Sequence, residues 1–139
     1  MFEIKNCPGT LAPNHTTYST TALRRLFGGK KVSPFMELLY DNEDTTEEIV
    51  ENIKRISISG VQEKLSAVIR KGKICLTPEG EQGLYIIKPA PSNKSLRFRN
   101  QIPANEHLTM QIARQVFAIE TGENGLLFFQ DNTPAYIIR

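Results

Sequence analysis

Two serines and a glycine that lead into a strand-like segment are the residues of this chain best suited to bind an anion. Ser57, Ser59 and Gly60 precede the alternating run at 65–69. Backbone N–H groups of such a turn can donate to phosphate oxygens, because glycine lets the chain approach closely. The pattern indicates a phosphate-binding loop, and an ordinary surface loop is the alternative interpretation.

A single lysine lies near the end of a second strand-like run. Lys88 follows four residues, Leu84-Tyr85-Ile86-Ile87, that can bury apolar side chains. Positioning and charge neutralisation are most of what a protein contributes to phosphoryl transfer, so a lysine beside such a loop suits nucleotide phosphates. A surface lysine that protects an edge strand is the alternative. We predict that Lys88 contacts phosphate.

The elements that must position these residues indicate an α+β fold. We expect an antiparallel sheet of about five strands, with Lys71 and Gly72 in a tight turn between the first two. One main helix should cover the sheet, starting near Pro103, which a first helical turn tolerates, and ending near Phe117. The expected strands are 64–70, 73–77, 84–88, 126–129 and 135–138.

The chain divides into two expected regions, an amino-terminal extension at 1–55 and a nucleotide-binding subdomain at 56–139. The extension starts as an irregular arm that packs on another part of the chain. Ser19 or Thr20 should cap a short helix that ends near Phe27, before two glycines. The remaining expected elements are a strand or extended connector at 34–40 and a helix from Thr45 or Thr46 to Lys54.

Composition argues against several classes of protein. The 139 residues carry 17 basic and 15 acidic side chains, a balance that does not call for a nucleic acid partner. Cys7 and Cys75 are too far apart for a zinc motif, and neither His15 nor His107 has metal-like neighbours, so we expect no metal site. No apolar run approaches the roughly 20 residues of a membrane span. We expect a cytoplasmic protein without membrane contact.

Three segments together resemble the amino-terminal lobe of the HipA-like serine/threonine kinases. They are Ser-Ile-Ser-Gly-Val-Gln-Glu-Lys at 57–64, Tyr-Ile-Ile-Lys-Pro at 85–89 and Asn-Glu-His-Leu at 105–108. The resemblance extends from Ser57 to the last residue, and 18–31 is similar to the short preamble of the HipT-like branch. It implies a kinase small lobe, in agreement with the expected sheet and covering helix.

The resemblance also implies a set of site residues. Glu106, in the first turn of the covering helix, should orient Lys88, although the helix dipole alone also favours a glutamate there. Glu63 and Lys64 point to opposite faces of a strand, and Lys64 is the expected phosphate contact. The implied nucleotide-binding residues are Ser59, Gly60, Val61, Gln62, Lys64 and Lys88.

Autophosphorylation within the loop is a further expectation from the family. Ser57 matches the regulated serine of HipA-like kinases, and Ser59 matches a second serine of the HipT-like branch. A phosphoserine adds nearly two negative charges, which repel the ATP phosphates and oppose closure of the loop.

The family's adenine-contacting hinge, catalytic aspartate and metal-binding aspartate follow the part that this chain resembles. We therefore expect no catalytic residue here and no activity of this chain alone. ATP and Mg²⁺ are the expected cofactors of the complete kinase, and none should be demonstrable for the isolated lobe. Implied partners are the kinase C-lobe, a HipS-like small protein and a HipB-like helix-turn-helix repressor. The implied role is the toxin of a bacterial toxin–antitoxin module linked to persistence, with an aminoacyl-tRNA synthetase as possible substrate. A noncatalytic partner-binding module of the same fold is the alternative.

Overall fold

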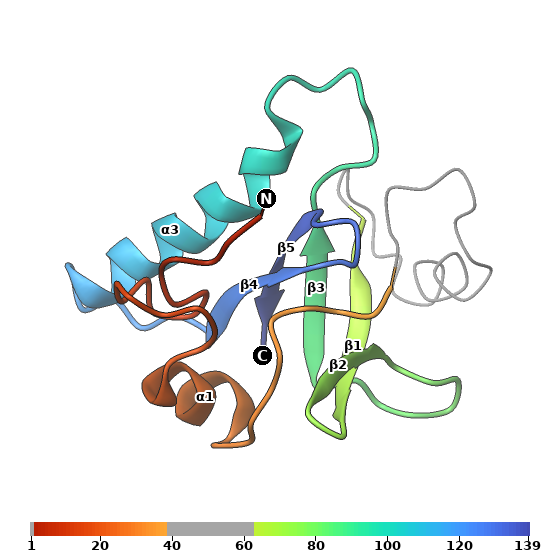
Figure 1. The fold of residues 1–139 in the computed structure, drawn as a ribbon, viewed down its shortest axis with the longest axis horizontal. Helices are drawn as coiled ribbons and strands as arrows, with labels where there is room; N and C mark the ends of the chain where they lie inside the picture. Colours follow the sequence, from red (N-terminus) through yellow and green to blue (C-terminus); the bar gives the residue numbers. More distant parts are fainter. Residues whose placement is uncertain (1, 39–62) are drawn as a thin grey trace.

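A computed structural model describes residues 2–38 and 63–139. The predicted α+β fold is confirmed: a curled antiparallel sheet of five strands packs with helices (Figure 1). The strands are β1 (Leu65–Arg70), β2 (Lys73–Leu76), β3 (Tyr85–Pro89), β4 (Asn124–Phe128) and β5 (Pro134–Ile138). Their order across the sheet is β2-β1-β3-β5-β4, and every neighbouring pair is antiparallel.

The tight turn predicted between the first two strands is present. Lys71 and Gly72 both have positive φ, 50° and 74°, as a two-residue hairpin with the twist of its strands requires. Gly72 also has no room for a side chain, because an added Cβ would lie 2.9 Å from the carbonyl oxygen of Lys31. The turn therefore packs directly against the segment that follows the first helix.

That first helix, α1 (Thr20–Phe27), begins and ends as its sequence predicts. The Ser19 side chain accepts a hydrogen bond from the backbone N–H of Ala22, and Gly28 adopts the left-handed conformation at the carboxyl end. Leu26 and Phe27 are buried against one face of the sheet. The strand residues in that core are Leu65, Ala67, Ile74, Leu76, Tyr85, Ile87, Leu127, Ala135 and Ile137.

The segment expected at 34–40 as a strand or extended connector is, in its described part, a connector with one isolated bridge. Phe35 forms a parallel bridge with Phe128. The Met36 N–H donates to the Phe128 carbonyl oxygen, and the Phe128 N–H donates to the Pro34 carbonyl oxygen. These bonds cover the outer edge of β4. A covered edge cannot pair with the strand of another chain.

The helix α3 (Ile102–Gln115) lies across the sheet on the β4–β5 side (Figure 1). A short 3-10 turn, η1 (Arg99–Gln101), precedes it, and Pro103 occupies its first turn as predicted. The helix ends two residues before the expected Phe117. The helix predicted from Thr45 or Thr46 to Lys54, and the boundary between 1–55 and 56–139, fall outside the described residues. No helix in the described part of the chain is both long and apolar enough to cross a bilayer.

Candidate functional site

The Lys88 and Glu106 side chains form an ion pair between the sheet and its covering helix. Lys88 Nζ donates to Glu106 Oε1 at 2.6 Å, and the two side chains are 25% and 23% exposed. Lys88 lies on β3, and Glu106 lies in the second turn of α3, one turn later than predicted. The contact expected from the sequence is therefore present, and it leaves an ammonium group partly open to solvent. Such a group can donate to an oxygen of an anionic ligand.

Tyr136 completes the surroundings of the lysine. It is the β5 residue directly opposite Lys88, and Lys88 Nζ lies 5.5 Å from the centre of its ring, within the range of a cation–π interaction. Burial, with a smaller effect of the Glu106 charge, raises the pKa of Tyr136 to about 12. The phenol is therefore neutral near pH 7, and among the residues that the structure describes Glu106 is the carboxylate that pairs with Lys88.

Lys64 lies at the same end of the sheet. Leu65 pairs with Ile87 in the antiparallel register of β1 and β3, so Lys64 and Lys88 are the next residues along the two strands. The Glu63 side chain is occupied elsewhere: its carboxylate accepts a hydrogen bond from the hydroxyl of Ser92, which lies in the segment that follows β3. The structure thus pairs two of the predicted residues, Lys88 and Glu106, and places Lys64 at the same end of the sheet.

The loop that should complete the phosphate site lies outside the described residues. This applies to Ser57, Ser59, Gly60, Val61 and Gln62. Among the residues that are described, no three metal-ligating side chains cluster.

A buried polar cluster fixes the orientation of α3, and it was missed in the sequence. Asn124 Oδ1 on β4 accepts a hydrogen bond from Gln111 Nε2 at 3.0 Å and lies 3.1 Å from His107 Nδ1. His107 and Gln111 are 1% and 6% exposed. The two residues are four apart on one face of α3, and His107 directly follows Glu106, so this cluster determines which way Glu106 points. Their spacing was the available signal.

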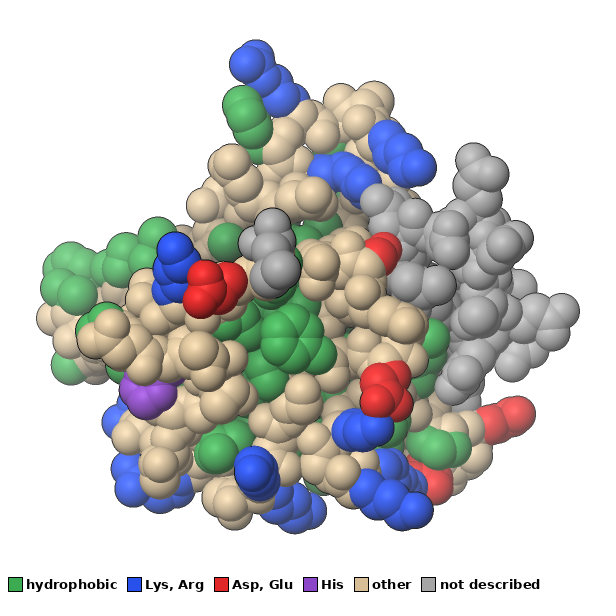
Figure 2. Space-filling model, in the orientation of Figure 1, with side chains coloured by type: hydrophobic (Ala, Val, Ile, Leu, Met, Phe, Trp, Pro, Cys, Tyr) green, Lys and Arg blue, Asp and Glu red, His purple; other side chains and the backbone are tan. Residues whose placement is uncertain are grey.

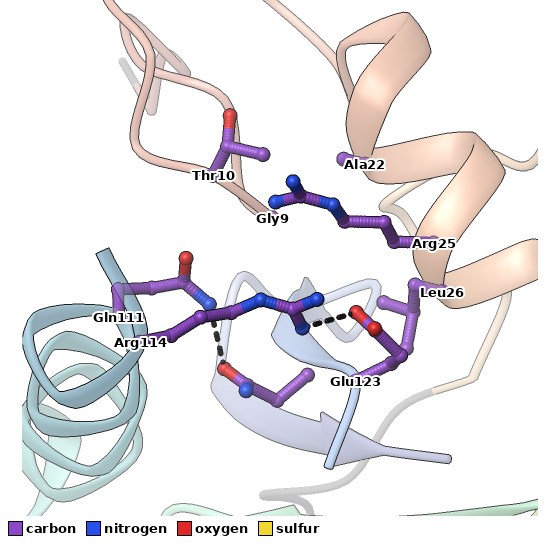
Figure 3. Close-up of a pocket in the computed structure, with 9 residues that line it drawn as sticks. Gly9, Thr10, Ala22, Arg25, Leu26, Gln111, Arg114 and Glu123 are labelled. Carbon is purple, nitrogen blue, oxygen red and sulfur yellow. Dashed lines mark hydrogen bonds and ion pairs between the residues drawn. The ribbon is translucent and has the colours of Figure 1, made fainter. Parts of the chain in front are cut away.

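An ion pair near the carboxyl end of α3 also holds the helix against the rest of the fold (Figure 3). Arg114 Nη1 donates to Glu123 Oε2 at 2.7 Å, and Gln115 Nε2 donates to the Thr10 carbonyl at 2.8 Å. The pocket in Figure 3, between α1, α3 and β4, has a volume of about 10 Å³. It holds no more than about one water molecule, so these residues brace the fold and do not form a ligand site.

The tautomer of His107 follows from the same cluster. Because Asn124 Oδ1 also accepts from Gln111, His107 Nδ1 must carry the proton and donate. His107 Nε2 is buried and has no hydrogen-bond partner in the described structure. Burial lowers the pKa of His107, and the bond to Asn124 opposes this only in part. The ring is therefore neutral near pH 7.

The outward face of α3 is apolar. Leu108, Ile112 and Val116 are 46%, 42% and 68% exposed, and Phe117 and Ile119 beyond the helix are 67% and 56% exposed. Figure 2 shows hydrophobic side chains gathered over the carboxyl end of α3. We call these five residues the α3 strip. Contiguous exposed apolar side chains of this kind mark surfaces that contact other molecules.

No protein-family model matches the chain, and no curated protein matches it. The resemblance to HipA-like kinases therefore stays a prediction that depends on the motifs themselves.

Proposed function

We propose that this chain is the amino-terminal, ATP-phosphate-binding lobe of a HipA-like protein serine/threonine kinase. The observation that carries the proposal is the Lys88–Glu106 pair, 2.6 Å apart and half-buried between β3 and α3. A lysine on a strand, oriented by a glutamate on the covering helix, is the arrangement by which kinases hold ATP phosphates. Both residues also belong to the motifs that carry the resemblance.

In this proposal Lys88 donates to phosphate oxygens while Glu106 keeps its side chain extended. The Lys88 side chain is 25% exposed, so in this proposal a phosphate reaches it without unfolding of the lobe. Partial burial strengthens the attraction, because the local dielectric constant is lower than that of water. Lys64, at the same end of the sheet, adds a second positive charge.

The remaining parts of the proposal follow from the resemblance. Ser59, Gly60, Val61 and Gln62 would donate from the loop, and phosphorylation of Ser57 or Ser59 would oppose ATP binding by like-charge repulsion. Mg²⁺ would neutralise phosphate charge when bound with ATP. The proposed setting is the cytoplasm and a bacterial toxin–antitoxin module linked to persistence, with the kinase C-lobe, a HipS-like protein and a HipB-like repressor as partners. An aminoacyl-tRNA synthetase is the proposed substrate.

Calorimetric titration with MgATP tests the proposal. With a HipA-like large lobe present, we expect binding by the unchanged chain and a loss of at least about tenfold in affinity for Lys88→Met, since a hydrogen bond to a charged group contributes about 1.5–3 kcal/mol. Lys73→Met is the matched control. Lys73 is a lysine of the same sheet that also pairs with a glutamate, Glu37, but at the exposed surface.

Two results would contradict the proposal. One is equal MgATP affinity for Lys88→Met and the unchanged chain, with both folded by circular dichroism. The other concerns the loop: after mixing with a HipA-like large lobe that restores phosphate transfer, mass spectrometry should find phosphate on Ser57 or Ser59. An unmodified loop in an active mixture would remove the proposed regulation.

A second candidate, a noncatalytic partner-binding module, is favoured by the α3 strip. Five large apolar side chains are 42% to 68% exposed on and just beyond one helix, which is a typical protein-binding surface. The titration separates the candidates, because a binding module has no reason to bind MgATP through Lys88. Val116→Glu would then abolish partner binding without affecting nucleotide affinity.

A further inference from the structure

An apolar pocket opens between α1, the segment that follows it and the β1–β2 turn. Its volume is about 540 Å³, within the roughly 300–1,000 Å³ of typical ligand pockets. Its lining is mainly apolar, and the apolar lining residues that stay partly or fully exposed are Leu23 and Phe35. The pocket lies on the opposite side of the sheet from the Lys88–Glu106 pair, because α1 and α3 cover opposite faces.

Two lysines without counter-ions line this pocket. Lys31 and Lys71 are both exposed, and neither forms an ion pair with any residue that the structure describes. Their backbones are held side by side, because the Ser33 N–H donates to the Gly72 carbonyl at 3.0 Å. The side chains of Lys31 and Lys71 therefore start from backbone segments that are hydrogen-bonded to each other, and both residues line the apolar pocket.

Segment 16–36, which supplies most of the residues that line the pocket, is basic, and Lys31 is its basic residue in the lining. Residues 16–36 contain four basic side chains, Arg24, Arg25, Lys30 and Lys31, and no aspartate or glutamate. Figure 2 shows Lys and Arg side chains over α1 and near the β1–β2 turn, where acidic side chains lie beside them. The formal net charge of the chain is only +2, so this concentration is local. Such a patch attracts an anionic partner and aligns it.

We infer that this pocket binds an acidic peptide that inserts one apolar side chain between Leu23 and Phe35 and places carboxylates against Lys31 and Lys71. Charge complementarity favours an acidic partner. The concave apolar lining favours a single anchoring side chain, as at the centres of protein interfaces. A membrane is a poorer occupant, because a bilayer surface requires apolar side chains that project outward.

Fluorescence anisotropy with a synthetic peptide tests the inference. The labelled peptide has glutamates flanking a central phenylalanine. A control peptide of otherwise identical sequence has alanine in place of that phenylalanine. We expect the double variant Lys31→Glu/Lys71→Glu to bind the phenylalanine peptide at least about tenfold more weakly. The matched control reverses two exposed lysines distant in sequence from the pocket, Lys5→Glu/Lys94→Glu, and should bind like the unchanged chain. Circular dichroism and thermal unfolding check that both variants fold.

Three outcomes would overturn the inference. Equal affinity for the phenylalanine and alanine peptides would mean that the pocket takes no anchor. Equal loss in the control variant would mean that binding depends on overall charge. Tighter binding to phosphatidylserine vesicles than to the peptide would identify a lipid surface instead. All measurements are made without nucleotide, so their failure leaves the assignment of Lys88 untouched.

Discussion

Lys88 Nζ and Glu106 Oε1 meet at 2.6 Å although the two residues are 18 positions apart in the chain. One belongs to the sheet and the other to the helix that covers it. The pair is half-buried, with 25% and 23% of the side chains exposed, so it is less screened than an ion pair at the open surface. It therefore both attaches α3 to β3 and holds the ammonium group in place.

The two side chains should be energetically coupled. In a double-mutant cycle of Lys88→Met and Glu106→Gln, we expect a coupling free energy of about 1 kcal/mol in the free energy of unfolding. Urea denaturation of the four proteins measures it. The same cycle at Lys73 and Glu37, whose side chains are 49% and 73% exposed, should give less than about 0.5 kcal/mol. Equal coupling at the two sites would show that burial adds nothing to the Lys88 pair.

Local signals were enough to predict most of the fold. The Lys71-Gly72 turn sets the β1–β2 register, and the Ser19 cap with Gly28 sets both ends of α1. These features depend on neighbouring residues alone, so the sequence displays them directly. Lys88 and Glu106 were predicted to meet only through the resemblance, since no local rule connects a strand residue with a helix so far along the chain.

The orientation of α3 could not be predicted. Hydrophobicity alone would turn Leu108 and Ile112 toward the sheet, yet they are exposed and His107 and Gln111 are buried. The physical reason is Asn124, a buried β4 residue whose side-chain oxygen accepts from Gln111 and His107. A buried amide requires partners, and only the folded sheet reveals that it faces the helix.

His107 makes the stability of the protein sensitive to mild acid. Burial lowers the pKa of His107 below its ordinary 6.5, so the unfolded chain binds this proton first as the pH falls. The contribution of the buried neutral ring to the free energy of unfolding is fully present above pH 6.5. It is lost as the pH falls from 6.5 toward the lowered pKa of His107 in the folded protein. The slope is at most about 1.4 kcal/mol per pH unit.

Urea denaturation between pH 7 and pH 5 measures this effect. His107→Gln should be less stable at pH 7, because the cluster with Asn124 is altered, but its free energy of unfolding should change less with pH. His15→Gln, on the amino-terminal arm, is the matched control and should keep the slope of the unchanged chain. If His107→Gln keeps that slope too, another group is responsible.

The amino-terminal arm packs on α1 too closely to allow a side chain at position 9. A Cβ added to Gly9 would lie 2.5 Å from Ala22 Cβ, so we expect Gly9→Ala to destabilise the fold by about 1–3 kcal/mol in urea denaturation. Ala22→Gly removes the opposing atom and by itself costs about 1 kcal/mol, because glycine disfavours helix. The double variant should be more stable than the sum of the two losses predicts. Simple additivity would mean that the arm moves aside instead.

The two thiols should differ in reactivity because of where the arm holds one of them. Cys7 is 0% exposed. Its sulfur accepts hydrogen bonds from the backbone N–H groups of Gly9, Thr10 and Ser19 at 3.2 to 3.3 Å. Burial raises the pKa of the Cys7 thiol, but the hydrogen bonds from Ser19 and Thr10 outweigh it and lower the pKa overall. A thiolate reacts faster than a thiol, yet a reagent cannot touch this sulfur in the folded chain.

Access of the reagent to each sulfur therefore determines how fast each thiol reacts. With a chromogenic disulfide reagent at neutral pH, we expect Cys75, which is only partly buried, to react at once and Cys7 to react slowly. The Cys7 rate should rise in Gly9→Ala, because that change loosens the arm and local opening limits the reaction. Cys75→Ser isolates the slow phase, and Cys7→Ser should remove it. If both thiols react at the same rate in the folded chain, the arm does not shield Cys7, and its contacts with α1 are formed only part of the time.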